Sequence, residues 1–137
     1  MIHLKVITPK KLAFEKDVTS ITVPTVAGEL TILPKHSDLL SLLKEGVVTI
    51  RTEKEEQYMS IGGGYMQTDG KSIQILVSRA FGQDEINEEM TQRAIESAQK
   101  VLEEVEDKAE RTEALSTLRR SMVDMKLLSK MRRKAKA

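Results

Sequence analysis

The stretch that decides the fold runs from Ile21 to Gly46 and reads ITVPTVAGELTILPKHSDLLSLLKEG. It begins with branched apolar residues, which are typical of a β-strand, and Pro24-Thr25 then opens a tight loop that ends at Gly28. A second short apolar strand follows and is closed by Pro34, after which we expect a leucine-rich turn up to Gly46. The stretch therefore predicts two successive strands joined by a tight loop.

Other segments before Gly82 alternate branched and polar residues with a period of two, so each would bury one face as a strand. These segments are Ile2 to Val6, Val18 to Val23, Val47 to Thr52, Gln57 to Ile61 and Ser72 to Val77. Because no helical pattern separates them, we expect an antiparallel β-sandwich or flattened barrel. Asp69-Gly70 predicts a hairpin with a type I′ turn, and Glu53 to Glu55 predicts a second hairpin.

Two glycine motifs invite comparison with phosphate-binding loops. Asp69-Gly70-Lys71-Ser72 lacks the glycine that a P-loop carries five residues earlier, and a strand follows it where a P-loop has a helix. The triple glycine from Gly62 to Gly64 is interpreted as a bulge or a close approach of two backbones. Both motifs thus favour strand architecture over a nucleotide site.

After Gly82 the pattern becomes helical, since residues 83–137 contain neither Gly nor Pro. Apolar residues recur every three or four positions in two stripes, one with Ile86, Met90, Ala94, Ala98 and Val105, the other with Leu115, Leu118, Met122, Met125 and Leu128. We expect an antiparallel helical hairpin with these stripes between the helices and Thr112 as the N-cap of the second. The chain is therefore divided into a β-sandwich domain, residues 1–82, and an α-helical hairpin domain, residues 83–137.

The net charge of +1 conceals two blocks of opposite sign in the helical part. Asp84 to Glu113 holds eleven acidic and four basic residues, a net charge of −7. From Arg119 onward eight basic residues accompany a single acid, Asp124; they are Arg119, Arg120, Lys126, Lys130, Arg132, Arg133, Lys134 and Lys136. The simplest interpretation is an acidic helix beside a basic one.

Composition argues against several classes of function. Cysteine is absent, which excludes disulfides and cysteine-based zinc sites, and His3 and His36 lie far apart with no nucleophile or metal-ligand spacing between them. We therefore expect no catalytic residue, no metal and no cofactor. The basic tail has no aromatic residue for base stacking or interfacial anchoring, so binding to nucleic acid or directly to a membrane is not expected. No apolar run approaches the length of a membrane-spanning helix.

The decisive stretch resembles the epsilon subunits of F-type ATP synthases. The resemblance rests on Pro24, Thr25, Gly28, Glu29, Ile32, Leu33, Pro34, His36, Leu39, Leu40 and Gly46, while Thr31 stands where many members carry Gly. It continues through Ser60 to Tyr65 and the charged helical tail, and so covers nearly the whole chain. It implies a non-catalytic central-stalk subunit whose sandwich binds the gamma subunit and rests on the ring of membrane c subunits.

The same resemblance suggests which residues contact these partners. Those expected to face the c-ring are Gly28, Glu29, Leu30, Pro34, Lys35, His36, Ser37 and Asp38, with Glu29 as the leading polar contact. The basic residues from Arg119 to Lys136 would meet an acidic segment of the beta subunit in the alpha/beta catalytic head and inhibit ATP hydrolysis when the helices extend. Because no Gly or Pro separates the helices, the hairpin is interpreted either as a switch or as a simple polar turn.

Some epsilon subunits bind ATP through an Ile-Asp-x-x-Arg-Ala motif together with arginines of the second helix. Here Asn87 follows Ile86, and Arg93-Ala94 comes three residues too late. Arg120 suits a phosphate partner, but Asp124 stands one turn later. Arg93 and Arg120 are therefore interpreted as helix-surface charges more than as nucleotide ligands.

Two alternatives remain open, a free-standing protein-binding adaptor and an ATP-sensing regulator. The expected location is the cytoplasmic face of the bacterial plasma membrane, held there only through the c-ring, and an organellar equivalent is not excluded. Whether H⁺ or Na⁺ is transported depends on the ring and is not readable from this chain.

Overall fold

The computed structural model describes residues 1–35 and 37–136, apart from the side chain of Lys136. It contains two compact units, Met1–Gln83 and a second that begins at Asp84. The first is built of strands and the second of helices. Each unit is considered by itself below.

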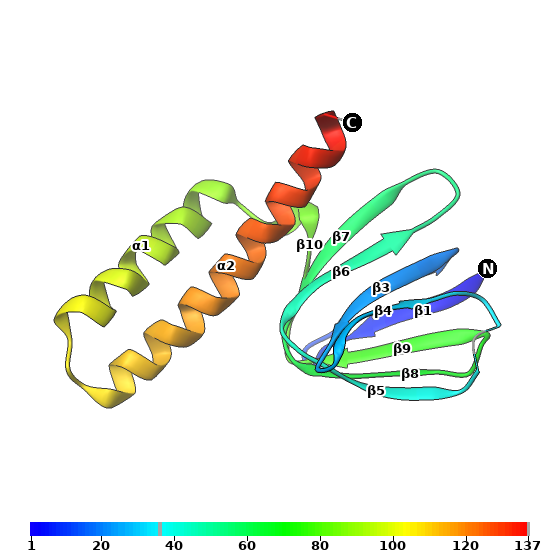
Figure 1. The fold of residues 1–137 in the computed structure, drawn as a ribbon, viewed down its shortest axis with the longest axis horizontal. Helices are drawn as coiled ribbons and strands as arrows, with labels where there is room; N and C mark the ends of the chain where they lie inside the picture. The colour runs from blue at the N-terminus through cyan, green and yellow to red at the C-terminus, as the bar shows by residue number, and fades with distance from the viewer. Residues whose placement is uncertain (36, 137) are drawn as a thin grey trace. The chain divides into compact units, whose positions relative to one another are not determined.

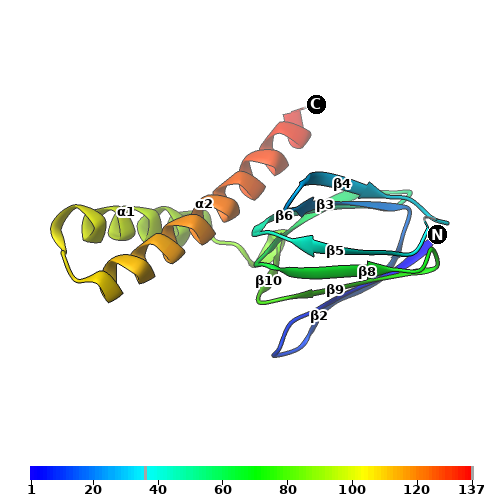
Figure 2. The same cartoon turned by 60° about the horizontal axis from the view of Figure 1, so that its bottom comes forward.

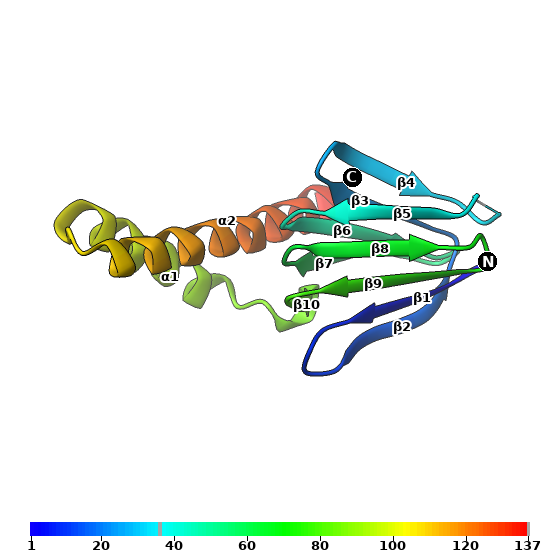
Figure 3. The same cartoon turned by 90° about the horizontal axis from the view of Figure 1, so that it is seen from below.

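The strand unit is one ten-stranded sheet folded into two layers (Figures 1 and 2). The first layer, sheet I, contains β4 (Gly28–Ile32), β3 (Ser20–Thr25), β6 (Gly46–Arg51), β7 (Glu56–Ile61) and β10 (Ala80–Gly82). The second, sheet II, contains β5 (Leu39–Leu43), β8 (Gly64–Thr68), β9 (Ser72–Val77), β1 (Ile2–Ile7) and β2 (Leu12–Val18), which lie side by side in Figure 3. The layers join where Thr25 of β3 pairs with Leu43 of β5, which confirms the sandwich.

One strand pair departs from the antiparallel expectation. β1 lies between β2 and β9, antiparallel to β2 and parallel to β9, with His3 opposite Ser72 and Ile7 opposite Leu76. All other pairs of strands in the described part of the chain are antiparallel. The N-terminal strand thus lies inside sheet II instead of at its edge.

The core lies between the two sheets and follows the period-two rule. In β1, Ile2, Leu4 and Val6 are fully buried, whereas His3 and Lys5 are half-buried on the other face. The same alternation buries Ile73, Ile75 and Val77 in β9. Ile21, Val23, Ile32, Val48, Ile50, Met59, Ile61 and Met66 complete most of the core.

The expected leucine-rich turn is wrong, because Leu39–Leu43 is strand β5 and pairs with β8. Leu43 is buried, whereas Leu40 and Leu42 are 67% and 62% exposed. Since leucine occupies both faces, the hydrophobic pattern does not alternate, and the sequence does not indicate a strand here. β2 was missed for a related reason, because its sequence LAFEKDV mixes charges into an edge strand.

Both expected hairpins form, but the type I′ turn at Asp69-Gly70 is wrong. Such a turn needs positive φ at both central residues, whereas among these residues only Gly70 has it, at 87°. The Asp69 carboxylate instead accepts hydrogen bonds from the backbone N–H groups of Lys71 and Ser72, at 2.9 and 2.8 Å. The aspartate side chain therefore holds this turn. The second hairpin joins β6 to β7, with Thr52 N–H donating to the Glu55 carbonyl at 2.9 Å.

The triple glycine marks one close approach of two backbones, as predicted, and it lies at Gly64. A Cβ on Gly64 would lie 2.0 Å from the Leu76 carbonyl oxygen of the neighbouring strand, and one on Gly62 would lie 2.1 Å from Ser78 Oγ. A Cβ on Gly63 would meet the Leu43 carbonyl oxygen at 3.6 Å, an ordinary contact. Packing against a neighbouring backbone thus requires a glycine at Gly64.

A 3₁₀ turn, Gln83–Glu85, spans the boundary between the units. The second unit contains two helices, α1 (Glu88–Glu104) and α2 (Lys108–Lys136), which pack side by side as a hairpin (Figure 1). Asn87 caps α1, its side-chain oxygen accepting from Met90 N–H at 2.9 Å. The expected N-cap Thr112 is wrong, because α2 begins four residues earlier. Asp107 caps it and accepts from Glu110 N–H at 3.0 Å.

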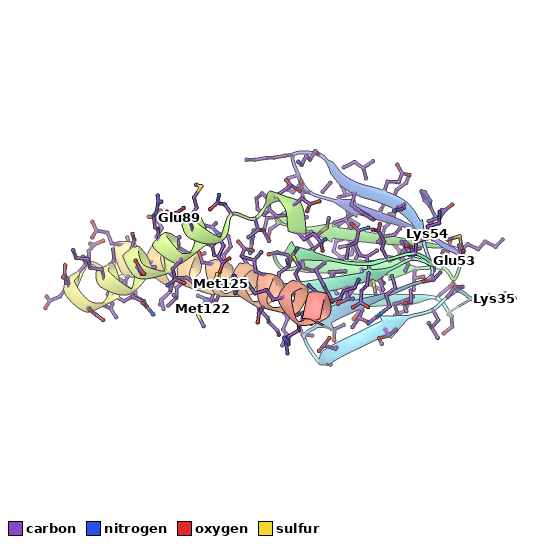
Figure 4. The ribbon with its side chains drawn as sticks, turned by 90° about the horizontal axis from the view of Figure 1, so that it is seen from above. Lys35, Glu53, Lys54, Glu89, Met122 and Met125 are labelled. Atoms are coloured by element: carbon purple, nitrogen blue, oxygen red, sulfur yellow. The ribbon has the colours of Figure 1, made fainter. Side chains whose placement is uncertain are left out.

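The expected Met and Leu stripes lie only partly inside the hairpin. The buried positions are occupied mainly by small residues, Thr91 and Ala98 in α1 and Ala114 and Ser121 in α2, together with Leu127. Met90, Leu115 and Met122 are instead 66%, 42% and 57% exposed (Met122 in Figure 4). Small side chains let two helices approach closely, and the longer side chains then remain outside.

Substitution of Gly64 by Ala tests the tight packing of β8 against β9. The added methyl group would overlap the Leu76 carbonyl, so we expect a loss of about 1–3 kcal/mol in the free energy of unfolding. Gly63→Ala is the matched control and should change stability by less than about 0.5 kcal/mol. Urea denaturation of the full chain measures both, and equal effects would contradict the packing role of Gly64.

Candidate functional site

The residues expected to contact the c-ring lie along β4, an edge strand of sheet I that pairs only with β3 in the described part of the chain. Gly28, Glu29 and Leu30 belong to its beginning, and Pro34 to Asp38 follow its end. At about 3.3 Å per residue, Gly28 and Pro34 are roughly 20 Å apart. The structure therefore arranges these residues as a strip along one edge of the sandwich instead of a single cluster.

The turn at the start of β4 is held by Thr25. Its hydroxyl donates to the Gly28 carbonyl at 2.5 Å and accepts from Ala27 N–H at 3.2 Å. Gly28 has a φ of 122°, which favours glycine at this position. Glu29 lies opposite Pro24 and is exposed, as is the neighbouring Val26 at 67%.

The segment after β4 is fastened to the tip of the β8–β9 hairpin. Lys35 has a φ of 66°, and its N–H donates to the Gly70 carbonyl at 3.0 Å. Lys35, Ser37 and Asp38 are exposed, and Pro34 is half-buried. His36 lies outside the described residues. Figure 4 shows Lys35 at the same end of the sandwich as Glu53 and Lys54 of the β6–β7 turn.

A second surface, not anticipated from the sequence, crosses the outer face of sheet II. The strand register places Leu42 opposite Tyr65, Tyr65 opposite Leu76, and Leu76 opposite Ile7, which in turn pairs with Leu12. We call these five residues the apolar row. Leu42, Tyr65 and Leu12 are 62%, 41% and 50% exposed, and Ile7 and Leu76 are half-buried.

The apolar row spans five adjacent strands, roughly 20 Å at the usual strand spacing. The next row on the same face is mostly polar and consists of Leu40, Gln67, Gln74, Lys5 and Glu15. A shallow groove of about 430 Å³ adjoins the apolar row and is lined by Ile7, Pro9, Gly64 and Tyr65, among others. A contiguous exposed apolar strip beside polar residues is typical of a protein-binding surface.

The helical hairpin is closed at both ends by arginine. At the turn, the Arg111 guanidinium donates to the carbonyls of Leu102 and Val105, at 2.5 and 3.2 Å, and so satisfies the free C-terminal end of α1. At the open end, Arg132 forms an ion pair with Glu88. The Arg132 hydrogen bond lowers the pKa of Glu88, and Glu88 raises the pKa of Arg132.

The basic tail residues lie along α2. Arg119, Arg120, Lys126, Arg132, Arg133 and Lys134 are exposed, and Lys130 is half-buried. The side chain of Lys136 lies outside the described part of the structure. Arg119, Lys126 and Arg133 are seven residues apart and therefore share one face of the helix.

The two arginines weighed as nucleotide ligands lie on different helices, Arg93 on α1 and Arg120 on α2. Arg93 pairs with Glu89 at 2.5 Å on the surface of α1, and Figure 4 shows Glu89 on the outside of the hairpin. A groove of about 460 Å³ does lie between the helices, lined by Ala94, Ala98, Ala114 and the carboxylate residues Glu110 and Glu113. Neither Arg93 nor Arg120 lines it, and its carboxylates would repel phosphate.

Comparison with known proteins agrees with this architecture. Residues 1–83 match the family described as ATP synthase, Delta/Epsilon chain, beta-sandwich domain. The chloroplastic ATP synthase epsilon chain of Adiantum capillus-veneris is 32% identical over 121 residues, which cover 88% of this chain and 92% of that protein. The ATP synthase epsilon chain of Rippkaea orientalis is 33% identical over 114 residues, 83% of this chain and 84% of that protein.

Solved structures show the same fold. A chain of the Euglena gracilis mitochondrial ATP synthase, in a structure of OSCP, F1 and the c-ring, matches with a TM-score of 0.77 at 22% identity, covering 95% of this chain and 81% of that one. A chain from the central stalk and c-ring of the Tetrahymena thermophila mitochondrial ATP synthase matches with a TM-score of 0.59 at 20% identity, covering 91% and 94%.

Replacing Arg111 by Met tests the closure of the helical hairpin. The substitution keeps the aliphatic stem and removes the donors to Leu102 and Val105. Hydrogen bonds from charged groups contribute roughly 1.5–3 kcal/mol, so amides at the C-terminal end of α1 should exchange with solvent about ten-fold faster or more. Lys108→Met, an exposed neighbour, is the control, and unchanged exchange in Arg111→Met would refute the capping role.

Proposed function

The chain belongs to the epsilon-subunit family of F-type ATP synthases, and we propose that it acts as a non-catalytic rotor subunit of the central stalk that couples the gamma subunit to the c-ring. The observation that carries the proposal is the apolar row on the outer face of sheet II. The structures that share this fold come from assemblies described as central stalk and c-ring, or as OSCP, F1 and c-ring. Membership of these assemblies supports a rotor subunit.

The apolar row is the proposed seat of the gamma subunit. A rotor subunit must turn with its partner without slipping, and burial of apolar surface at about 25 cal/mol per Å² provides a strong attachment. Tyr65 lies at the centre of the exposed part of the row, between Leu42 and Leu76. Tyrosine is enriched among the residues that dominate interface energetics, so it is the proposed anchor.

The strip along β4 is the proposed contact with the c-ring. Glu29 is exposed at one end of β4, and Lys35, Ser37 and Asp38 are exposed beyond the other end. Polar and charged groups spread over roughly 20 Å suit contacts with several neighbouring loops of a ring. Membrane association would then be indirect. Neither helix in the described ranges combines the length and apolar character that crossing a bilayer requires.

The helical unit is proposed to regulate ATP hydrolysis. Exposed basic residues along one face of α2 would bind an acidic segment of the alpha/beta catalytic head, while the hairpin state described here keeps Arg132 paired with Glu88. Regulation would then exchange Glu88, the carboxylate partner of Arg132 within the chain, for a carboxylate of the catalytic head. We place the complex at the cytoplasmic face of the bacterial plasma membrane, with the organellar equivalent as the other location.

Tyr65→Ser tests the gamma contact. Loss of the central aromatic side chain should weaken binding of the full chain to a gamma-containing catalytic complex about ten-fold or more. Gln74→Ser, in the neighbouring polar row of the same sheet, is the matched control and should bind normally. If the wild-type chain itself does not bind, the result favours a free-standing protein-binding adaptor. If Tyr65→Ser binds like wild type, the gamma subunit binds another surface of the chain.

Neutralising the shared basic face of α2 tests regulation. We expect the Arg119→Gln, Lys126→Gln, Arg133→Gln triple variant to bind gamma normally but to inhibit ATP hydrolysis several-fold less, because it lacks charges for the acidic partner. The control carries the same number of exposed changes on the sandwich, Lys10→Gln, Lys11→Gln and Lys54→Gln. Equal inhibition by wild type and the tail variant would remove electrostatic anchoring from the mechanism.

A further inference from the structure

His3 lies between two carboxylates on the outer face of sheet II. Its Nδ1 is 2.7 Å from Asp17 Oδ1, and its Nε2 is 2.6 Å from Glu15 Oε2. His3 belongs to β1, whereas both acids belong to β2. One imidazole ring thus bridges the two strands through both of its nitrogens.

This geometry suits the protonated form of the ring. A neutral imidazole carries one N–H, so it can donate to one carboxylate while its other nitrogen directs a lone pair at the second. The imidazolium ion donates to both. Two contacts of hydrogen-bond length to two ionised, acceptor-only carboxylates therefore favour a protonated ring.

Other charged and polar groups lie near this cluster on its own strand and on β9. On β1, Lys5 Nζ is 3.8 Å from Glu15 Oε2. On the β9 side, the backbone N–H of His3 donates to the Lys71 carbonyl at 3.0 Å, and Ser72 lies opposite His3. The hydrogen bonds that His3 donates to Asp17 and then to Glu15 raise its pKa above the ordinary value.

β2 is an edge strand, and within the described residues it pairs only with β1. The bridge crosses that single ladder, where Asp17 lies opposite His3 and Glu15 opposite Lys5. A separate ion pair, Lys16 Nζ to Glu55 Oε1 at 3.3 Å, ties β2 to the β6–β7 turn and does not depend on histidine. β2 also carries Leu12, the last residue of the apolar row.

We propose that His3, Glu15 and Asp17 form a proton-dependent clasp that fastens edge strand β2 to β1, so that this end of the outer face is fully ordered only while His3 is protonated. The clasp contributes stability below the unfolded-state histidine pKa of about 6.5 and loses it as the pH rises through the higher folded-state pKa. β2 would then fray more readily at alkaline pH around Glu15 and Asp17.

The test is an NMR titration of the full chain between pH 5 and 9, at about 25 °C, with amide exchange followed along β2. His36→Gln leaves one histidine signal, which assigns His3. We expect His3 to titrate above 6.5, and Asp17→Asn and Glu15→Gln each to lower its midpoint. After correction for intrinsic exchange, β2 amides should exchange about two- to five-fold faster on the alkaline side, the range expected for exposed ion pairs.

His3→Gln should exchange at the alkaline rate at every pH, whereas the matched His36→Gln should behave like wild type. A His3 midpoint at or below 6.5, or identical pH profiles for wild type and His3→Gln, would overturn the clasp. No partner protein is needed, so the result is separate from the fate of the gamma contact.

Discussion

The packing of two sheets around one shared core is the constraint on which the other features depend. Ile2, Leu4 and Val6 all point inward from β1, so the residues between them must face outward. The same rule in β8 buries Met66 and places Tyr65 outside. The apolar row is thus a consequence of core packing. Once the inner positions of the five strands are fixed, the strand register also aligns the residues on the outer face.

An element of this fold can be predicted from the sequence when one of its faces is polar. Strands with one polar face, such as Ile2–Ile7, are predicted from alternation, whereas Leu39–Leu43 is apolar on both faces and looks like a turn. The apolar row could not be predicted at all, because it combines five strands whose register is set by pairing in space. Similarly, Gly28 and Asp38 look adjacent in a motif, but an intervening strand separates them.

The helical unit shows the same limit in another form. Periodicity identifies two helices, but it does not say which stripe packs inward. In the structure, small residues occupy most of the buried positions and methionines remain exposed. Asp107, as N-cap, was overlooked because it lies in an acidic run where it resembles its neighbours. Arg111 reaches back to the preceding helix, a contact that sequence spacing does not reveal. Local propensity determines the elements, and long side chains determine how they close.

The parallel pairing of β1 with β9 has a consequence for how the chain acquires its structure. His3 lies beside Ser72, about seventy residues later in the sequence, so the first strand has no neighbour on that side until nearly the whole sandwich has been synthesised. Until then β1 and β2 can exist only as a hairpin, which is marginally stable alone. Closing so long a loop is slow, and it leaves strand edges open to misassociation in the meantime. Completion of sheet II is therefore expected to be a late step of folding. A newly made chain that binds its partners only after that step avoids misassociation through its open strand edges.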